Sequence, residues 1–133
     1  MEKALIIGAS GGIGSAVSDA LEARGVAVTG LSRSKDGLDV TNEASVQEHL
    51  GALEGPFDLI FVATGALEIN GSEPEKTIKH LTADAMLDQF KLNTIGPAMV
   101  LKHSIKLLPR RAPATFAALS ARVGSIGDNR LGG

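Results

Sequence analysis

The stretch KALIIGASGGIGSA, residues 3–16, joins a short apolar run to a turn crowded with glycines. Residues 4–7 predict a strand buried on both faces, because the run is apolar without alternation. A helix is predicted next, since apolar residues recur at helical spacing and Arg24-Gly25 offers a C-terminal cation and glycine. Residues 26–31, VAVTGL, predict a second strand. Strand, glycine turn, helix and strand make a βαβ unit.

The rest of the chain continues this alternation. Further strands are predicted over residues 37–40 (GLDV), 57–63 (FDLIFVA) and 114–119 (ATFAAL). Alternating strands and helices predict an α/β fold with a parallel sheet covered on both faces. We therefore expect one Rossmann-type domain over residues 1–133, a doubly wound parallel sheet with strand order 3-2-1-4-5.

The remaining helices are predicted from their caps and their breaks. Residues 41–43, Thr-Asn-Glu, offer N-cap chemistry for a helix that Gly55-Pro56 ends. A long helix is predicted to begin near Thr82 or Asp84 and to end before Pro109. Residues 66–81 are polar and are expected to form a surface loop or a short helix.

Composition excludes several classes of function. The chain of 133 residues is 44% hydrophobic and has a net charge of −2, so no nucleic-acid partner is expected. It has no cysteine and only scattered histidines, so neither a disulfide nor a metal site is predicted. No apolar stretch approaches the roughly 18 residues of a membrane span. A cytoplasmic protein without a membrane partner is expected.

The glycine turn is a candidate phosphate site. In a βαβ unit this turn meets a helix N-terminus, where unpaired N–H groups and the helix dipole favour an anion. Glycines let the backbone approach a pyrophosphate closely. The alternative is a turn whose glycines serve folding alone. The residues predicted to bind the phosphates are Gly8, Ser10, Gly11, Gly12, Ile13 and Gly14.

The end of the second predicted strand favours NADP over NAD. An acid there would bind the ribose 2′-hydroxyl of NAD, whereas an arginine would accommodate the 2′-phosphate of NADP. The sequence LSRSK places Ser32 and Arg33 at this point, and no acid appears before Asp36. Arg33 offers a fork of donors and Ser32 a hydroxyl. The alternative is that Arg33 and Lys35 form a solvated basic turn.

Gly8, Gly12 and Gly14 fit GxxxGxG, and GASGGIG resembles the cofactor motif of the short-chain dehydrogenase/reductase (SDR) family. The segments LDVTN, VATG, LNTIGP and LSARVGS resemble further motifs of that family, in the same order. LNTIGP and SARVGSIGDN are most similar to C-factor-like proteins and small carbonyl reductases. The glycines also fit GxxGxxG, which leaves an epimerase-like branch open, although LNTIGP argues against it.

The resemblance implies an NADP-dependent oxidoreductase that transfers hydride between NADPH and a small carbonyl or alcohol substrate. It implies that the complete protein is a homodimer or homotetramer. It also implies roles for further residues: Asp39, Val40, Ala63, Thr64 and Gly65 would contact the cofactor, and Asn93 and Ser120 would serve catalysis.

In this family a catalytic Tyr, and a Lys four residues after it, follow the serine segment, but this chain contains no tyrosine. We therefore expect an SDR domain truncated before its C-terminal strands, inactive alone, whether it is a true fragment or an incomplete sequence. Ala121 stands where relatives often carry the catalytic serine, so Ser120 or Ser125 would have to substitute. The alternative function is a non-catalytic NAD(P)-binding regulator or sensor.

Pro97 interrupts the long predicted helix. A proline has no N–H to donate to the carbonyl of residue i−4, which is Asn93 here. A kink and a free Asn93 carbonyl are therefore expected. The resemblance implies that this carbonyl holds a water in a proton relay. The alternative is that Gly96-Pro97 only relieves packing.

Overall fold

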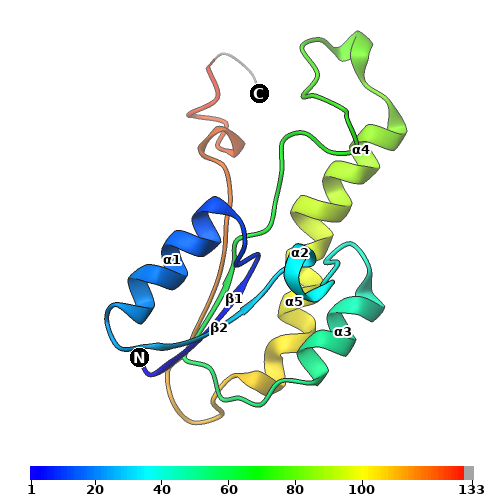
Figure 1. The fold of residues 1–133 in the computed structure, drawn as a ribbon. Coiled ribbons are helices and arrows are strands. Elements are labelled where there is room, and N and C mark those ends of the chain that lie inside the picture. The colour runs from blue at the N-terminus through cyan, green and yellow to red at the C-terminus, as the bar shows by residue number, and fades with distance from the viewer. Residues whose placement is uncertain (131–133) are drawn as a thin grey trace.

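Four parallel strands form one sheet at the centre of the computed structural model (Figure 1). The model describes residues 1–130, so the last three residues of the predicted domain, 131–133, lie outside the described part. The strands are β1 (Lys3–Ile7), β2 (Ala27–Leu31), β3 (Leu59–Val62) and β4 (Thr115–Ala118). Their order, β2-β1-β3-β4, is the one expected for these four segments.

The strands end at a common level because their registers are aligned. Ile7 at the end of β1 pairs with Leu31 of β2 on one side and with Val62 of β3 on the other. Val62 in turn pairs with Ala118 of β4. The segments that leave all four strands therefore begin at one edge of the sheet, which is where ligands bind in open parallel sheets.

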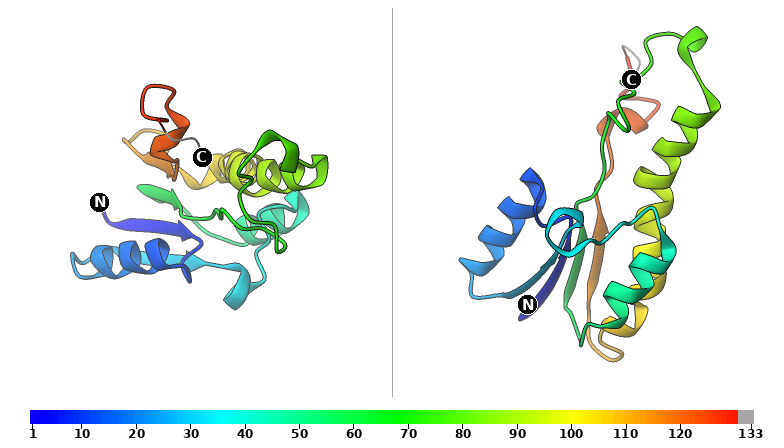
Figure 2. Two further views of the ribbon diagram at one scale, coloured as in Figure 1. Left: turned by 90° about the horizontal axis from the view of Figure 1, so that it is seen from above. Right: turned by 45° about the vertical axis from the view of Figure 1, so that its right-hand side comes forward.

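Helices cover both faces of the sheet, as the doubly wound class requires (Figure 2). Helix α1 (Gly12–Glu22) packs on β1 and β2. On the opposite face, α3 (Glu43–Gly51) and α5 (Gly96–Ser104) pack together. Because strand side chains alternate between faces, Leu5 and Ile7 join the core under α3 and α5. That core also contains Val46, Leu50, Ile60, Val62 and Val100.

The strand predicted over residues 37–40 does not form. The chain leaves β2 into a short helix, α2 (Arg33–Asp36), which ends at Gly37 in the left-handed conformation (φ 76°). The following backbone bonds to side chains instead of a neighbouring strand, because Asp39 N–H donates to Ser45 Oγ and Thr41 N–H donates to Asp39 Oδ1. The apolar alternation that suggested a strand still buries Leu38 and Val40 in the core.

The cap predicted for the next helix is confirmed. Asn42 is the N-cap of α3, and its Oδ1 accepts from the N–H of Ala44 at 3.1 Å. This bond satisfies one of the N–H groups that lack a partner within the helix.

The long predicted helix is present and is interrupted near Pro97. Helix α4 (Ala83–Phe90) leads into a π-helical turn (Lys91–Ile95), then α5, and then a 3₁₀ turn (Ile105–Leu107). The N–H of Gly96 bonds to Lys91 O, five residues back, just before the proline. A wider turn of this kind is one way in which a helix accommodates the bond that proline cannot make.

The segment between β3 and α4 is largely exposed, as predicted. It contains an isolated bridge between Ile69 and Ser72 and a 3₁₀ turn (Ile78–His80). After β4 the chain forms one more 3₁₀ turn (Arg122–Gly124). Among residues 1–130, no helix has both the length and the apolar character needed to cross a membrane.

Candidate functional site

A cleft of about 540 Å³ opens at the carboxyl edge of the sheet. The strand order reverses between β1 and β3, because β2 lies on one side of β1 and the later strands lie on the other. This switch point is the expected ligand site of a doubly wound sheet. Most of the predicted cofactor residues line the cleft: Gly8, Ser10, Gly11, Ser32, Arg33, Asp39, Val40, Ala63, Thr64 and Gly65. The others, Gly12, Ile13 and Gly14, form the adjoining first turn of α1.

The glycine turn is fixed by backbone contacts that only glycine permits. Gly8 has a φ of 85°, and a Cβ there would lie 3.0 Å from the carbonyl carbon of Ala63. A Cβ on Gly14 would overlap the carbonyl oxygen of Gly8. The turn is also bound to β2, since the N–H groups of Gly8 and Ala9 both donate to Leu31 O, at 2.8 and 3.1 Å. These two glycines therefore have a role in folding whatever ligand binds.

Two other glycines of the turn are not demanded by packing. A Cβ on Gly12 would have no neighbour within 4 Å, and one on Gly11 would meet only Gly8 O at 3.5 Å, an ordinary contact. Neither residue is among those with a positive φ. The absence of side chains at these positions leaves open space in front of the helix.

The N-terminus of α1 has the features of an anion site. Gly11 is its N-cap, no side chain caps it, and its first turn contains no acid. The first N–H groups of a helix have no partner within the helix, and the helix dipole places partial positive charge there. The turn thus presents uncapped N–H donors beside the cleft, as the sequence analysis predicts.

The turn after β2 separates an arginine from the nearest acid. Ser32 is buried, its Oγ accepts from Lys35 N–H at 3.2 Å, and its own N–H donates to Asp36 Oδ2 at 2.8 Å. Asp36 is therefore engaged with the backbone of α2 and does not line the cleft, whereas Arg33 lines it. Within residues 1–130 the Arg33 guanidinium forms no ion pair, so it is available to an anionic group.

Asp39 lines the next part of the cleft and is shaped by its own turn. Its Oδ1 accepts from both the N–H and the hydroxyl of Thr41, at 2.9 and 2.6 Å. This bonding fixes the orientation of the carboxylate. Val40 beside it is buried and packs against Gly96, where a Cβ would lie 3.0 Å from Val40 Cγ2.

The end of β3 forms the floor of the cleft. Thr64 Oγ1 is buried and has no hydrogen-bond partner in the described part of the chain. A buried polar atom without a partner is uncommon and costly, so a ligand group or water is expected to reach it. Gly65 has a φ of 145°, and a Cβ on it would lie 3.0 Å from Asn93 Oδ1.

Asn93 acts in this structure as a clamp between the long helix and the loop after β3. Its Oδ1 accepts from Ala66 N–H at 3.0 Å, and its Nδ2 donates to Ala66 O at 2.9 Å. The same Nδ2 donates to Gln89 Oε1 at 2.8 Å. Asn93 does not itself line the cleft, but it holds the backbone that does.

Ser120 forms no hydrogen bond with Asn93 or Ala66 within residues 1–130. It follows β4, is exposed and is absent from the cleft lining. The two predicted catalytic residues thus belong to separate segments at the same sheet edge.

One wall of the cleft was missed by sequence reasoning. Asp88, Lys91 and Leu92 line it from the long helix. Their spacing of three and four residues places them on one helix face, which is the signal that identifies them together. Asn70, whose Nδ2 donates to Asp88 Oδ2 at 3.1 Å, lines the same wall from the preceding loop.

A family model, the NAD dependent epimerase/dehydratase family, matches residues 4–91. The chain belongs to this family. The match spans the βαβ unit, the turn of Arg33 and Asp39, the end of β3 and the first part of the long helix. It is the epimerase-like branch that the GxxGxxG spacing left open. No curated protein matches the chain.

Solved structures share the fold. Protein lin1944 from Listeria innocua is 26% identical with a TM-score of 0.71, and the match covers 87% of this chain and 54% of that one. A small-chain dehydrogenase in complex with NADPH is 23% identical with a TM-score of 0.72, covering 86% of this chain and 49% of that one. The L780 UDP-rhamnose synthase from Acanthamoeba polyphaga mimivirus is 27% identical with a TM-score of 0.56, covering 78% of this chain and 33% of that one.

These similarities establish the general type of domain. The chain corresponds to the N-terminal, NAD(P)-binding Rossmann part of SDR and epimerase oxidoreductases, and it spans about half the length of the first two structures above. Neither the family model nor these structures support the more specific C-factor-like branch.

Proposed function

We propose that this chain is the cofactor-binding part of an NADP-dependent oxidoreductase of the SDR type. The enzyme would transfer hydride between NADPH and a small carbonyl or alcohol substrate. The observation that carries the proposal is the pairing of an uncapped glycine N-terminus with Arg33 on one cleft, while Asp36 is held by the N–H of Ser32. That arrangement offers one anion site for a pyrophosphate and a second for a 2′-phosphate.

The residues of the cleft fit a dinucleotide. The glycine turn would receive the pyrophosphate at the N-terminus of α1, Arg33 the 2′-phosphate, and Asp39 the adenine edge. Thr64 Oγ1, which is buried and has no hydrogen-bond partner among residues 1–130, supplies a hydroxyl at the floor of the cleft. The bound nicotinamide would supply the hydride, and the loop clamped by Asn93 would bound its end of the cleft.

The proton chemistry is only partly present in these residues. A general acid or base contributes roughly 10²–10⁴ in rate. The 133 residues contain no tyrosine, and Ser120 is exposed and away from the cleft lining. We therefore propose that residues 1–133 alone bind cofactor without turnover, because hydride transfer lacks both its acid and a dry, organised site.

Binding and turnover are measured separately. NADPH and NADH are titrated into the chain by calorimetry, and NADPH oxidation is followed by absorbance with a panel of aldehydes, ketones and quinones. Tighter binding of NADPH without oxidation is expected. Equal affinity for the two cofactors would refute the role given to Arg33. Sustained oxidation would refute the dependence on an acid outside these residues.

A second candidate is a non-catalytic NAD(P)-binding regulator or sensor. The lack of a tyrosine and the presence of Ala121 after Ser120 favour it. The two candidates predict different results for the longest natural form of the protein. Turnover by that form identifies an enzyme, whereas cofactor binding without turnover, accompanied by a change in binding to another molecule, identifies a sensor.

We also propose that the protein is a homodimer or homotetramer. The long helix exposes large apolar side chains, including Met86 (42%), Phe90 (52%) and Ile95 (48%). Exposed apolar surface of this kind marks an interaction site in soluble proteins. Light scattering at micromolar concentration tests this proposal, and a monomeric mass would contradict it.

A further inference from the structure

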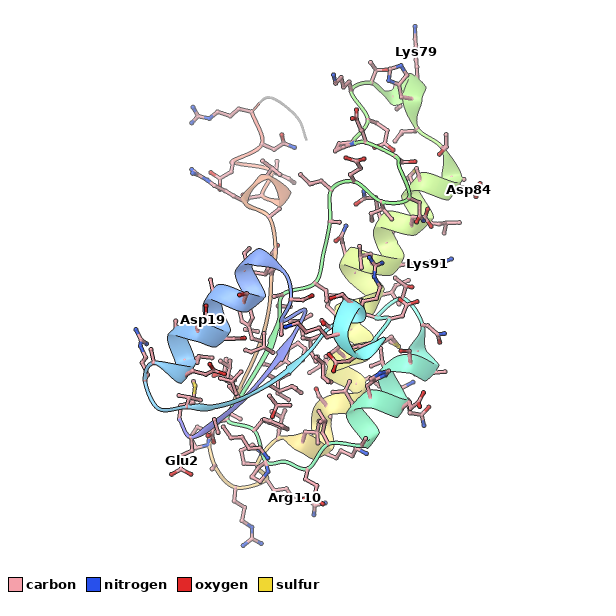
Figure 3. The ribbon with its side chains drawn as sticks, viewed as in Figure 1. Glu2, Asp19, Lys79, Asp84, Lys91 and Arg110 are labelled. Carbon is pink, nitrogen blue, oxygen red and sulfur yellow. The ribbon has the colours of Figure 1, made fainter. Side chains whose placement is uncertain are left out.

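A second hollow, of about 470 Å³, lies between α3 and α5, where four basic side chains gather. Lys102, His103, Lys106 and Arg110 line it, together with Gln47, and no acidic residue is part of the lining. We call it the basic hollow. Figure 3 shows Arg110 at the lower end of the molecule, the end at which Glu2 also lies, whereas Lys91 of the cofactor cleft lies well above it. The basic hollow is therefore separate from that cleft.

The charge of the basic hollow is only partly balanced. Glu43 pairs with Lys102 at 2.6 Å and with His103 at 2.9 Å. The hydrogen bond from Lys102, followed by that from His103, lowers the pKa of Glu43. Within residues 1–130, no carboxylate forms an ion pair with Lys106 or Arg110. In a chain with a net charge of −2, this is a local excess of positive charge.

Lys106 is placed by the end of a helix. A Cβ on Gly51, the last residue of α3, would lie 4.0 Å from Lys106 Nζ. The ammonium group thus lies beside the C-terminal turn of α3, where the helix dipole favours a cation.

Lys106 and Arg110 also face an adjoining hollow of about 580 Å³, which Arg111 lines as well. The two hollows meet at these shared cations. An anion lying between them would be reached by Lys106 from the 3₁₀ turn after α5 and by Arg110 from the segment that leads to β4.

We propose that the basic hollow binds a small ligand with two or more phosphate charges. Its volume falls within the roughly 300–1,000 Å³ range of small-molecule sites. The guanidinium of Arg110 offers a planar fork for phosphate oxygens. Lys102 at the end of α5 and Lys106 in the following 3₁₀ turn add point charges. A ligand with a single charge would engage only part of this set.

The test is a titration of the ¹⁵N-labelled full chain with inorganic diphosphate, read as amide shifts. Diphosphate should shift the amides of residues 47–51 and 102–111, independently of those of the glycine turn. Arg110→Gln should weaken binding at the hollow about tenfold. Glu43→Gln, which releases two cations, should strengthen it about two- to threefold. Arg24→Gln, on α1's side of the sheet, is the matched control and should change nothing.

The variants also separate this proposal from that for the cofactor cleft. NADPH affinity should be the same in Arg110→Gln as in the wild type, because Arg110 does not line the cleft. Shifts confined to residues 11–14 would overturn the proposal, as would equal weakening by Arg24→Gln. Tighter binding of a short glutamate peptide than of diphosphate would overturn the choice of a small phosphate. Orthophosphate and a nucleoside diphosphate, run in parallel, distinguish a free phosphate from one carried on an organic group.

Discussion

Helices α1 and α2 begin beside the same cleft, but side chains cap the N-terminus of α2 and not that of α1. In α2, Ser32 Oγ accepts a hydrogen bond from Lys35 N–H, and the Asp36 carboxylate accepts one from Ser32 N–H. In α1, Gly11 caps nothing and the first turn has no acid. In α2, side chains satisfy these backbone groups, and a different side chain, that of Arg33, lines the cleft. In α1, where no side chain of residues 1–130 caps the helix, the N–H groups themselves are the proposed binding groups.

The largest expected effect comes from Gly14→Ala, which acts on the packing of α1. The added Cβ would overlap Gly8 O and lie 2.8 Å from the Gly8 carbonyl carbon. Since backbone atoms have to move, we expect a loss of more than about 3 kcal/mol in the free energy of unfolding. Gly12→Ala is the control, because its Cβ meets nothing within 4 Å, and it should stay within about 1 kcal/mol of the wild type. Urea denaturation measures both, and equal midpoints would contradict the packing argument.

Gly12→Val acts on the open side of the same turn. With no neighbour within 4 Å of the new Cβ, the fold should be retained. The branched side chain would occupy the space in front of α1, so we expect NADPH affinity to fall about a hundredfold or more, equivalent to about 3 kcal/mol. Calorimetric titration measures the effect, after thermal melting has verified that the variant is folded. Unchanged affinity would mean that the turn serves folding alone.

Arg33→Ala acts on the capped helix and should reduce only the preference for NADPH. Loss of a charge-assisted phosphate contact costs about 1.5–3 kcal/mol, or roughly ten- to a hundredfold in affinity. NADH affinity should remain nearly constant, because NADH has no 2′-phosphate. Lys35→Ala is the control, since Lys35 lies on the same helix but does not line the cleft. Equal losses for both cofactors would make Arg33 a general surface charge.

The smallest expected effect concerns the far end of α2, where His49 contacts two carbonyl oxygens. The carbonyl of Ser45, 2.8 Å from Nδ1, and then that of Asp36, 2.9 Å from Nε2, raise the pKa of His49. Both nitrogens donate only in the protonated ring. Its stabilising contribution is therefore complete below the ordinary histidine pKa and is lost as pH rises through the raised value.

Thermal melting from about pH 6 to pH 8 measures this loss. The stability difference between the wild type and His49→Gln should shrink as the pH rises. Because both proteins contain the other two histidines, the difference in stability between them isolates the contribution of His49. A constant difference across this range would mean that the protonated ring does not hold Asp36.

The sequence predicted the βαβ unit well because its signals are local. The apolar run of β1, the glycines and the helical spacing of α1 lie within 22 residues. The strand over residues 37–40 was wrong because Leu38 and Val40 alternate as in a strand, yet bonds from Asp39 and Thr41 close a turn. Asp88, Lys91 and Leu92 were missed because their local sequence does not show that the long helix lies beside the carboxyl edge of the sheet. That placement involves tertiary contacts, such as the bond between Asn93 and Ala66, which are 27 residues apart.

Short contacts join the glycine turn to the start of α2, which are the two proposed anion sites of the cleft. The N–H groups of Gly8 and Ala9 bind Leu31 O, and Ser34 Oγ donates to Ser10 Oγ at 3.0 Å. The glycine turn and the start of α2 are therefore held at a set distance before any ligand arrives. A ligand that spans both sites is then selected by the length between its anionic groups as well as by its charge. If both proposed sites bind phosphate, a molecule with its phosphates at the wrong spacing would bind through only one of them.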